Sequence, residues 1–150
     1  MNVYLLDTNI ISETRCPERI NANVEKWLNK TDSGALYTSA ISMMELERGV
    51  LRMERKDDKQ GRILRAWLED TVKPTFTNRI LPIDAETASI CARLHIPDPA
   101  PENDAWIAAT AIQHALILVT RNTSDFIATG VHLHNPFNAC PAPRNPMQPQ

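Results

Sequence analysis

Short, mostly apolar runs alternate along the chain with longer segments in which apolar residues recur at helical spacing. The runs, each a predicted strand, are Val3–Leu6, Ala35–Ala40, Arg79–Ile83, Leu116–Thr120 and Val131–Leu133. Aliphatic runs of this length are typical of strands buried in the middle of a sheet. Strands that alternate with helices indicate βαβ units. We therefore predict an α/β fold with a central, mostly parallel sheet and helices on both faces.

The helical segments include one pair that no strand separates. Amphipathic or short segments are predicted over Ile10–Arg15, Ile20–Asn29, Ser42–Met53, Glu54–Thr71, Asp84–Leu94 and Asp125–Ala128, and a segment that is apolar nearly all round covers Ala105–Ala115. Because Ser42–Met53 and Glu54–Thr71 follow each other directly, we predict an antiparallel helical hairpin that protrudes from the sheet. We expect Ser42 to cap its first helix and Pro74 to break the pattern after its second.

Length and composition limit the possible functions. The 150 residues are enough for one domain with a real core, which we place over residues 1–137, followed by a proline-rich, irregular tail over residues 138–150. The net charge is −2, so contact with nucleic acid would need a local patch, a metal ion or a partner. The chain shows no signal peptide, no apolar run long enough to span a membrane, and three widely spaced cysteines, a pattern that favours a cytoplasmic protein.

Acidic side chains stand where parallel packing would bring them to one edge of the sheet. Asp7 follows the first apolar run, Glu45 lies in the first turn of the helix after the second run, and Asp104, with Asn103, opens the apolar helix. Further polar residues follow the fourth run, namely Thr120, Asn122, Thr123 and Asp125. Because right-handed crossovers place every strand-to-helix turn at the same edge, we expect these side chains to converge.

Converging carboxylates indicate a metal site. Carboxylates that lie together repel one another unless a cation joins them, and all-oxygen ligands suit Mg²⁺ or Mn²⁺. A divalent ion in such a site polarises a phosphoryl oxygen and activates a water, which predicts phosphodiester hydrolysis. Taken singly, Asp7, Glu45 and Asp104 have ordinary explanations as a turn residue, a solvated helix residue and a helix cap. Their coincidence at one edge favours the chemical interpretation.

Two other polar groups give weaker signals. His132 and His134 share a face of the last predicted strand, but the sequence offers no third metal ligand nearby. The predicted hairpin is rich in basic residues, namely Arg48, Arg52, Arg55, Lys56, Lys59, Arg62 and Arg65. We interpret these as its solvated face, with contact to an RNA backbone as the alternative.

Five stretches resemble, in order, the motifs of one known family. They are LLDTNIISE at Leu5–Glu13, SAISMMELERGV at Ser39–Val50, RILPID at Arg79–Asp84, NDAWIAATA at Asn103–Ala111 and VTRNTSDF at Val119–Phe126. The sequence resembles the PIN-domain ribonucleases and, within them, the VapC-type toxins of bacterial toxin–antitoxin pairs, especially the FitB-like branch. The resemblance covers residues 3–137 and implies a three-layer α/β/α PIN domain.

The resemblance also implies roles for single residues. By motif position, Asp7 and Asp104 would be the main metal ligands, and Glu45 would complete the acidic site through a water or a second metal. The fourth acid of some members falls at Asn122, which carries no charge, and Asp125 is the alternative three residues later. The residues that would orient the acids or touch the phosphate are Thr8, Asn9, Ser39 and Thr120.

The function that the resemblance implies is that of a toxin. Such a protein would be a Mg²⁺- or Mn²⁺-dependent endoribonuclease that leaves 5′-phosphate and 3′-hydroxyl ends. It would form a homodimer, bind a small DNA-binding antitoxin, and assemble with that antitoxin on operator DNA.

Two other functions remain open at this level. LLDTN also resembles the opening motif of haloacid-dehalogenase-like phosphatases, although those enzymes need a second Asp where this chain has Asn9. With Asn122 in place of an acid, the domain would instead be a catalytically weak module that acts mainly with an antitoxin in DNA-bound repression. The retained trio Asp7, Glu45 and Asp104 argues against that alternative.

Overall fold

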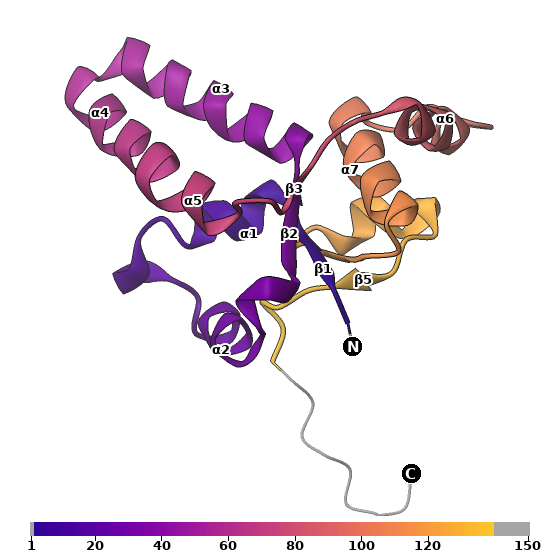
Figure 1. Cartoon of the computed structure of the whole chain (residues 1–150), viewed down its shortest axis with the longest axis horizontal. Helices are drawn as coiled ribbons and strands as arrows, with labels where there is room; N and C mark the ends of the chain where they lie inside the picture. Colours follow the sequence, from indigo (N-terminus) through magenta and orange to yellow (C-terminus); the bar gives the residue numbers. More distant parts are fainter. Residues whose placement is uncertain (1, 140–150) are drawn as a thin grey trace, which may run out of the picture.

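A sheet of five parallel strands forms the centre of the molecule (Figure 1). The computed structural model describes residues 2–139 of the chain. Its strands are β1 (Tyr4–Leu6), β2 (Leu36–Ser39), β3 (Ile80–Leu81), β4 (Ile117–Val119) and β5 (Leu133–His134), in the order β3-β2-β1-β4-β5. Every pairing between them is parallel, so the sheet predicted as mostly parallel is wholly so in the described chain. β1 is the middle strand, and whatever follows it therefore lies at the centre of the sheet edge.

Neighbouring residues of β1 point into two separate layers of helices. Leu6 packs in a core with residues of α1 (Thr8–Glu13) and α2 (Ala22–Lys30), whereas Leu5 packs against α7 (Glu102–Gln113). α6 (Ala85–Leu94) covers the outside of α7, as Figure 1 shows. This alternation confirms the prediction of helices on both faces and of an α/β/α arrangement.

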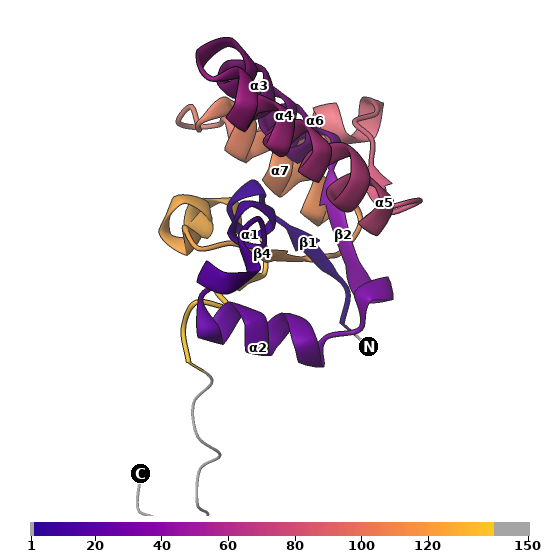
Figure 2. The same cartoon turned by 90° about the vertical axis from the view of Figure 1, so that its left-hand side faces the viewer.

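The predicted helical hairpin is present and extends away from the sheet. It consists of α3 (Ala40–Lys56) and α4 (Asp58–Trp67), which lie at the opposite end of the molecule from α2 (Figure 2). α4 continues through a π-helical turn, Leu68–Val72, into the short α5 (Lys73–Thr75). The two long helices approach closely at Gly61, where an added Cβ would lie 2.4 Å from the Cα of Glu54.

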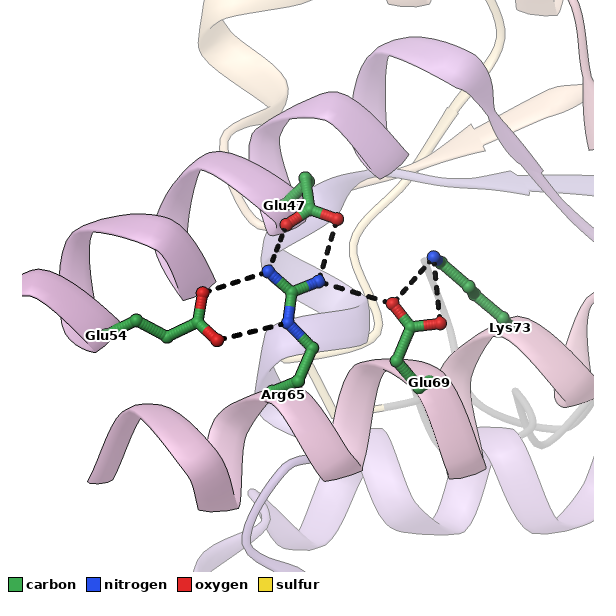
Figure 3. A network of polar contacts seen from close by, with 5 residues as sticks. All are labelled: Glu47, Glu54, Arg65, Glu69 and Lys73. Carbon is green, nitrogen blue, oxygen red and sulfur yellow. Dashed lines mark hydrogen bonds and ion pairs between the residues drawn. The ribbon is translucent and has the colours of Figure 1, made fainter. Parts of the chain in front are cut away.

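A network of ion pairs joins the two helices of the hairpin (Figure 3). The Arg65 guanidinium on α4 donates to both carboxylate oxygens of Glu47 and of Glu54 on α3, at 2.5 to 3.3 Å. It also donates to Glu69 at 3.2 Å, and Glu69 accepts from the Lys73 ammonium at 2.8 Å. These hydrogen bonds hold the pKa values of Glu47 and Glu69 below their usual range. The hairpin is thus closed by a cluster in which each carboxylate meets a cation.

Several helix boundaries differ from the predicted ones; α3, for example, runs on to Lys56, so α4 begins at Asp58 and not at Glu54. Ser39, not Ser42, caps α3, because its extended backbone lets Ser39 Oγ accept the Ser42 N–H at 3.0 Å. α7 begins at Glu102 after Pro101, so Asp104 lies within its first turn and is not its cap. The helical run of the hairpin continues past Thr71, because Pro74 takes the second position of α5, where its missing N–H costs little.

The other short helical elements are 3₁₀ turns at Pro17–Arg19, Ser33–Ala35 and Thr123–Thr129, the last of which contains the segment predicted over Asp125–Ala128. Within residues 2–139, no helix is both long and apolar enough to cross a membrane. Most of the predicted proline-rich tail, residues 140–150, lies outside the described residues, so the irregular structure expected there stays a prediction.

Candidate active site

Asp7 lies at the centre of the carboxyl edge of the sheet and is held by several hydrogen bonds. Its backbone N–H donates to the Val119 carbonyl at 2.9 Å, which extends the β1–β4 pairing by one residue. Its Oδ1 accepts from the N–H of Thr8 at 2.7 Å, so Asp7 also caps α1. Its Oδ2 accepts from the Thr120 hydroxyl at 2.8 Å and from the Asn9 amide at 3.3 Å. Only 6% of Asp7 is exposed, so this carboxylate has a fixed orientation.

Thr8 connects Asp7 to the second acid, Glu45. Besides its backbone bond to Asp7, its hydroxyl lies 2.6 Å from Glu45 Oε1 and 2.9 Å from Ser42 Oγ. A hydroxyl has one proton, and a carboxylate can only accept, so Thr8 donates to Glu45 and Ser42 donates to Thr8. The start of α3 is therefore tied to the start of α1 through this single side chain.

The third acid, Asp104, directly follows Asn103, which connects α7 to Glu45. Asn103 Nδ2 donates to Glu45 Oε2 at 3.4 Å, which joins the first turn of α7 to α3. Burial raises the pKa of Asp104, and the charges of Asp125 and Glu45 raise it further. Asp104 therefore lies close enough to Glu45 and Asp125 for their charges to act on it. We call Asp7, Glu45 and Asp104 the acidic site.

Mutual repulsion is also visible at Asp7. Burial raises the pKa of Asp7 to about 6, hydrogen bonds from Thr120 and Thr8 oppose the rise, and the charges of Glu45 and Asp104 add to it. Within the described residues, none of the three carboxylates takes part in an ion pair with a basic side chain. The acidic site thus concentrates negative charge that no basic side chain of residues 2–139 neutralises.

The ligand chemistry of the acidic site fits a hydrated divalent cation. In residues 2–139, no group of three or more Asp, Glu, His or Cys side chains is arranged to hold a metal ion on its own. Mg²⁺ does not need such a cage, because it keeps several waters and is usually bound by one or two carboxylates. A cation at this site would lower the raised pKa values of Asp7 and Asp104. The residues present therefore fit Mg²⁺ or Mn²⁺ with protein oxygens and water as ligands.

The other predicted site residues take different places around the acids. Asn9 donates to Thr120 Oγ at 3.2 Å and accepts the Arg121 N–H at 3.2 Å, so it fixes the end of β4 beside Asp7. Ser39 is buried and caps α3, so within the described contacts it supports Ser42 and does not touch an acid.

Asn122 and Asp125, the two alternatives for the fourth acidic position, make different contacts. Asn122 is exposed; its N–H donates to Thr120 Oγ at 3.1 Å, and its carbonyl accepts the Asp125 N–H at 3.0 Å. Asp125 is exposed too, and its charge is the first after burial among the causes that raise the pKa of Asp104.

Two residues that bear on the acidic site were not predicted as part of it. Ser42 and Asn103 were identified only as helix starts, yet each connects to Glu45, one through Thr8 and one directly. The available signal was their position, since Ser42 lies three residues before Glu45 and Asn103 directly precedes Asp104.

The histidine pair gains no support as a metal site. The His134 ring lies 5.2 Å from the Trp27 ring, and burial lowers the pKa of His134. Its Nε2 is buried and has no hydrogen-bond partner among residues 2–139. His134 borders a cavity of about 400 Å³ together with Tyr4 and Trp27, away from the acidic site. His132 is exposed, and no acid or histidine of the described chain completes a metal site with the two.

The family of the chain follows from this fold and from comparisons with known proteins. A family model for the PIN domain matches residues 4–131, and the chain belongs to the PIN-domain family. It is 39% identical over 142 residues to toxin FitB of Neisseria gonorrhoeae, which covers 91% of this chain and 99% of that relative. It is 35% identical over 140 residues to VapC ribonuclease Y4jK of Sinorhizobium fredii, which covers 90% of this chain and 98% of that relative.

A solved structure agrees with these sequence matches. The fold is similar to a chain in the structure of FitAB bound to an IR36 DNA fragment, with a TM-score of 0.81 and 35% identity over 91% of this chain and 96% of that chain. The family and fold predicted from the five motifs are thus confirmed, and the phosphatase alternative loses its basis.

Proposed function

We propose that this protein is an endoribonuclease that depends on Mg²⁺ or Mn²⁺ and that it acts as the toxin of a toxin–antitoxin pair in the cytoplasm. The observation that carries the proposal is the acidic site, where hydrogen bonds of Thr8 and Asn103 connect Asp7, Glu45 and the first turn of α7. Its carboxylates have no basic partner among the described residues, and the charges of Glu45 and Asp104 raise the pKa of Asp7. The names of the similar proteins, toxin FitB and VapC ribonuclease Y4jK, support the same activity.

The residues of the site have distinct tasks in this proposal. Asp7 and Asp104 would hold a divalent ion, with Glu45 bound through a water or a second ion. Such an ion would polarise the phosphate and lower the pKa of the attacking water. Thr8, Asn9 and Thr120 keep the Asp7 carboxylate oriented, and we assign the fourth acidic position to Asp125 because its charge reaches Asp104 whereas Asn122 has none.

The similarity to the FitAB structure also suggests the partners of this protein. FitAB is bound to DNA in the similar structure, so we propose that this protein binds a small DNA-binding antitoxin and, as a homodimer, joins it on operator DNA. Co-expression with candidate small DNA-binding proteins, followed by size-exclusion chromatography with and without DNA, would test this part.

Cleavage of total cellular RNA by the purified full chain, free of antitoxin, tests the enzymatic proposal. The assay compares Mg²⁺, Mn²⁺ and EDTA for the wild type and for Asp104→Asn. We expect discrete fragments that require the metal and that are lost in the variant, whose carboxamide keeps the shape of the side chain without its charge. Cleavage that persists in EDTA, or that is equal in Asp104→Asn, would contradict the proposal. Metal binding without any cleavage would favour the catalytically weak module.

A further inference from the structure

A line of basic side chains continues along α3 from the acidic site. Arg48, Arg52 and Lys56 lie three, seven and eleven residues after Glu45, a spacing that places them on the same side of the helix. All three are exposed. We call them the basic strip.

The cations of the basic strip differ in their contacts from those of the neighbouring helix. Within residues 2–139, no ion pair or side-chain hydrogen bond involves Arg48, Arg52 or Lys56. On α4, by contrast, Arg65 is held by three glutamates and Arg62 pairs with Asp58. Because α3 directs Glu47 and Glu54 toward Arg65, Glu45 of the acidic site is the carboxylate of this helix that remains on the side of the strip.

The geometry of the strip suits an extended anion. Successive cations from Arg48 to Arg52 and from Arg52 to Lys56 are one helical turn apart, about 6 Å along the axis. Gly49 lies on the same side between Glu45 and Arg52, and an added Cβ there would meet nothing within 4 Å. A ligand can therefore run close to the helix between the acidic site and the cations. A nucleic-acid strand carries phosphate charges at regular intervals. A strand with one phosphate at the acidic site could therefore place its next phosphates along these cations.

We propose that the basic strip binds the phosphates of the RNA substrate on one side of the bond that is cut. This inference rests on the proposed ribonuclease function and extends it to the path of the strand. Contacts between phosphates and exposed Arg or Lys are independent of sequence, because they read the backbone and not the bases. The strip would then strengthen binding of every RNA, while sequence preference would come from elsewhere.

The test compares two variants of the full chain that lose the same charge. One is Arg48→Gln/Arg52→Gln/Lys56→Gln, and the control is Lys26→Gln/Lys59→Gln/Arg93→Gln, in which three other exposed cations on α2, α4 and α6 are removed. Binding of a fluorescein-labelled oligouridylate is measured by anisotropy in EDTA, over a series of salt concentrations. The proposed catalytic acids are intact in both variants, and no turnover is needed for this readout.

We expect the strip variant to bind at least about tenfold more weakly at low salt, and its slope of log K against log salt to fall by about 2, as three lost phosphate contacts require. The control should stay within about twofold of the wild type. Equal effects in the two variants would overturn the proposal, because they would report net charge alone.

Parallel cleavage of total RNA by the wild type separates this inference from the function on which it rests. A wild type that cleaves RNA, beside a strip variant that binds as the wild type does, would refute the basic strip alone. A wild type that neither cleaves nor binds RNA would refute both. Retained RNA affinity together with lost binding of a co-expressed protein partner would assign the strip to that partner and would overturn the proposal.

Discussion

Two clusters of carboxylates lie on opposite sides of one helix, α3. Glu45 and Glu47 are only two residues apart, yet Glu45 belongs to the acidic site and Glu47 contacts Arg65 in the hairpin. In the acidic site, the pKa values of Asp7 and Asp104 are raised, and no basic side chain of the described chain pairs with the three acids. In the hairpin, hydrogen bonds from cations lower the pKa values of Glu47 and Glu69. The same residue type thus stabilises the fold where it is compensated and is available for chemistry where it is not.

Two substitutions on α3 test most directly whether the acidic site and the hairpin cluster have separate roles. Glu45→Gln should lower RNA cleavage by about a hundredfold or more, because it removes a charge that supports the metal. Glu47→Gln should leave the rate unchanged, since Glu47 contacts only the hairpin cluster in the described structure. Initial rates on the same RNA with Mg²⁺ provide the measurement. Equal losses in both variants would show that the two clusters do not have separate roles.

Asp7 should make the fold less stable as the pH rises. Its pKa is about 6 in the folded protein and near 3.8 when exposed, so between these values the folded state binds more protons than the unfolded state. Stability from this group is therefore present below about pH 4, falls between pH 4 and 6, and stays lower above pH 6.

Asp7→Asn should remove that penalty. Because the amide of the variant cannot accept every hydrogen bond that the carboxylate accepts, the change with pH is the test. Between pH 4 and pH 7 in EDTA, the free energy of unfolding of the variant relative to the wild type should rise by about 1 to 3 kcal/mol. Urea unfolding at several pH values measures this difference. A relative stability that does not change with pH would contradict the electrostatic account, and added Mg²⁺ should stabilise only the wild type.

Two glycines of the hairpin should respond to alanine in opposite ways. Gly61→Ala places a Cβ against the backbone of Glu54 and should destabilise the protein by about 1 to 3 kcal/mol, because the helices must separate. Gly49→Ala meets open space on α3 and should stabilise it by about 0.5 to 1 kcal/mol. Chemical denaturation of both variants is sufficient, and the same sign of change in each would contradict the close approach at Gly61.

The smallest expected effect concerns the ion pairs themselves. Arg65→Met keeps the aliphatic part of the side chain but leaves Glu47, Glu54 and Glu69 without their shared cation, so the melting temperature should fall by a few degrees. Arg62→Met is the control, since its ion pair with Asp58 is more than three-quarters exposed and should contribute almost nothing. The difference should shrink at high salt, where exposed charges are screened. If the melting temperature of Arg62→Met fell as far as that of Arg65→Met, the Arg65 cluster would not be the more important of the two.

The sequence predicts the elements of this fold better than their ends. Aliphatic runs identify the five strands, and helical spacing identifies the hairpin. The start of α3 was misplaced because Ser39 and Ser42 are both capable caps, three residues apart, and only the extended backbone of Ser39 decides between them. The extension to Thr75 was missed because proline is unfavourable inside a helix but acceptable in its first turn, and a sequence does not show that a π-helical turn precedes it.

The acids of the site follow from the order of strands and helices, but their connections do not. Asp7, Glu45 and Asp104 were placed together because turns after parallel strands share one edge. The double role of Thr8 depends on how closely α1 and α3 approach, and the contact of Asn103 with Glu45 depends on the orientation of α7. Such distances between elements remote in sequence have no local signal, so these residues could be identified only from the structure.

The strand order has a consequence for when the protein becomes active during its synthesis. β1 is made first but lies in the middle of the sheet, and β4, which is made late, forms one of its two neighbours. Asp7 and Glu45 leave the ribosome long before Asp104 and before Thr120, which holds Asp7 in place. A nascent chain therefore carries an incomplete acidic site until its last third has emerged. Under the proposed function, translation itself would delay cleavage, and an unfinished chain would not cut the RNA around it.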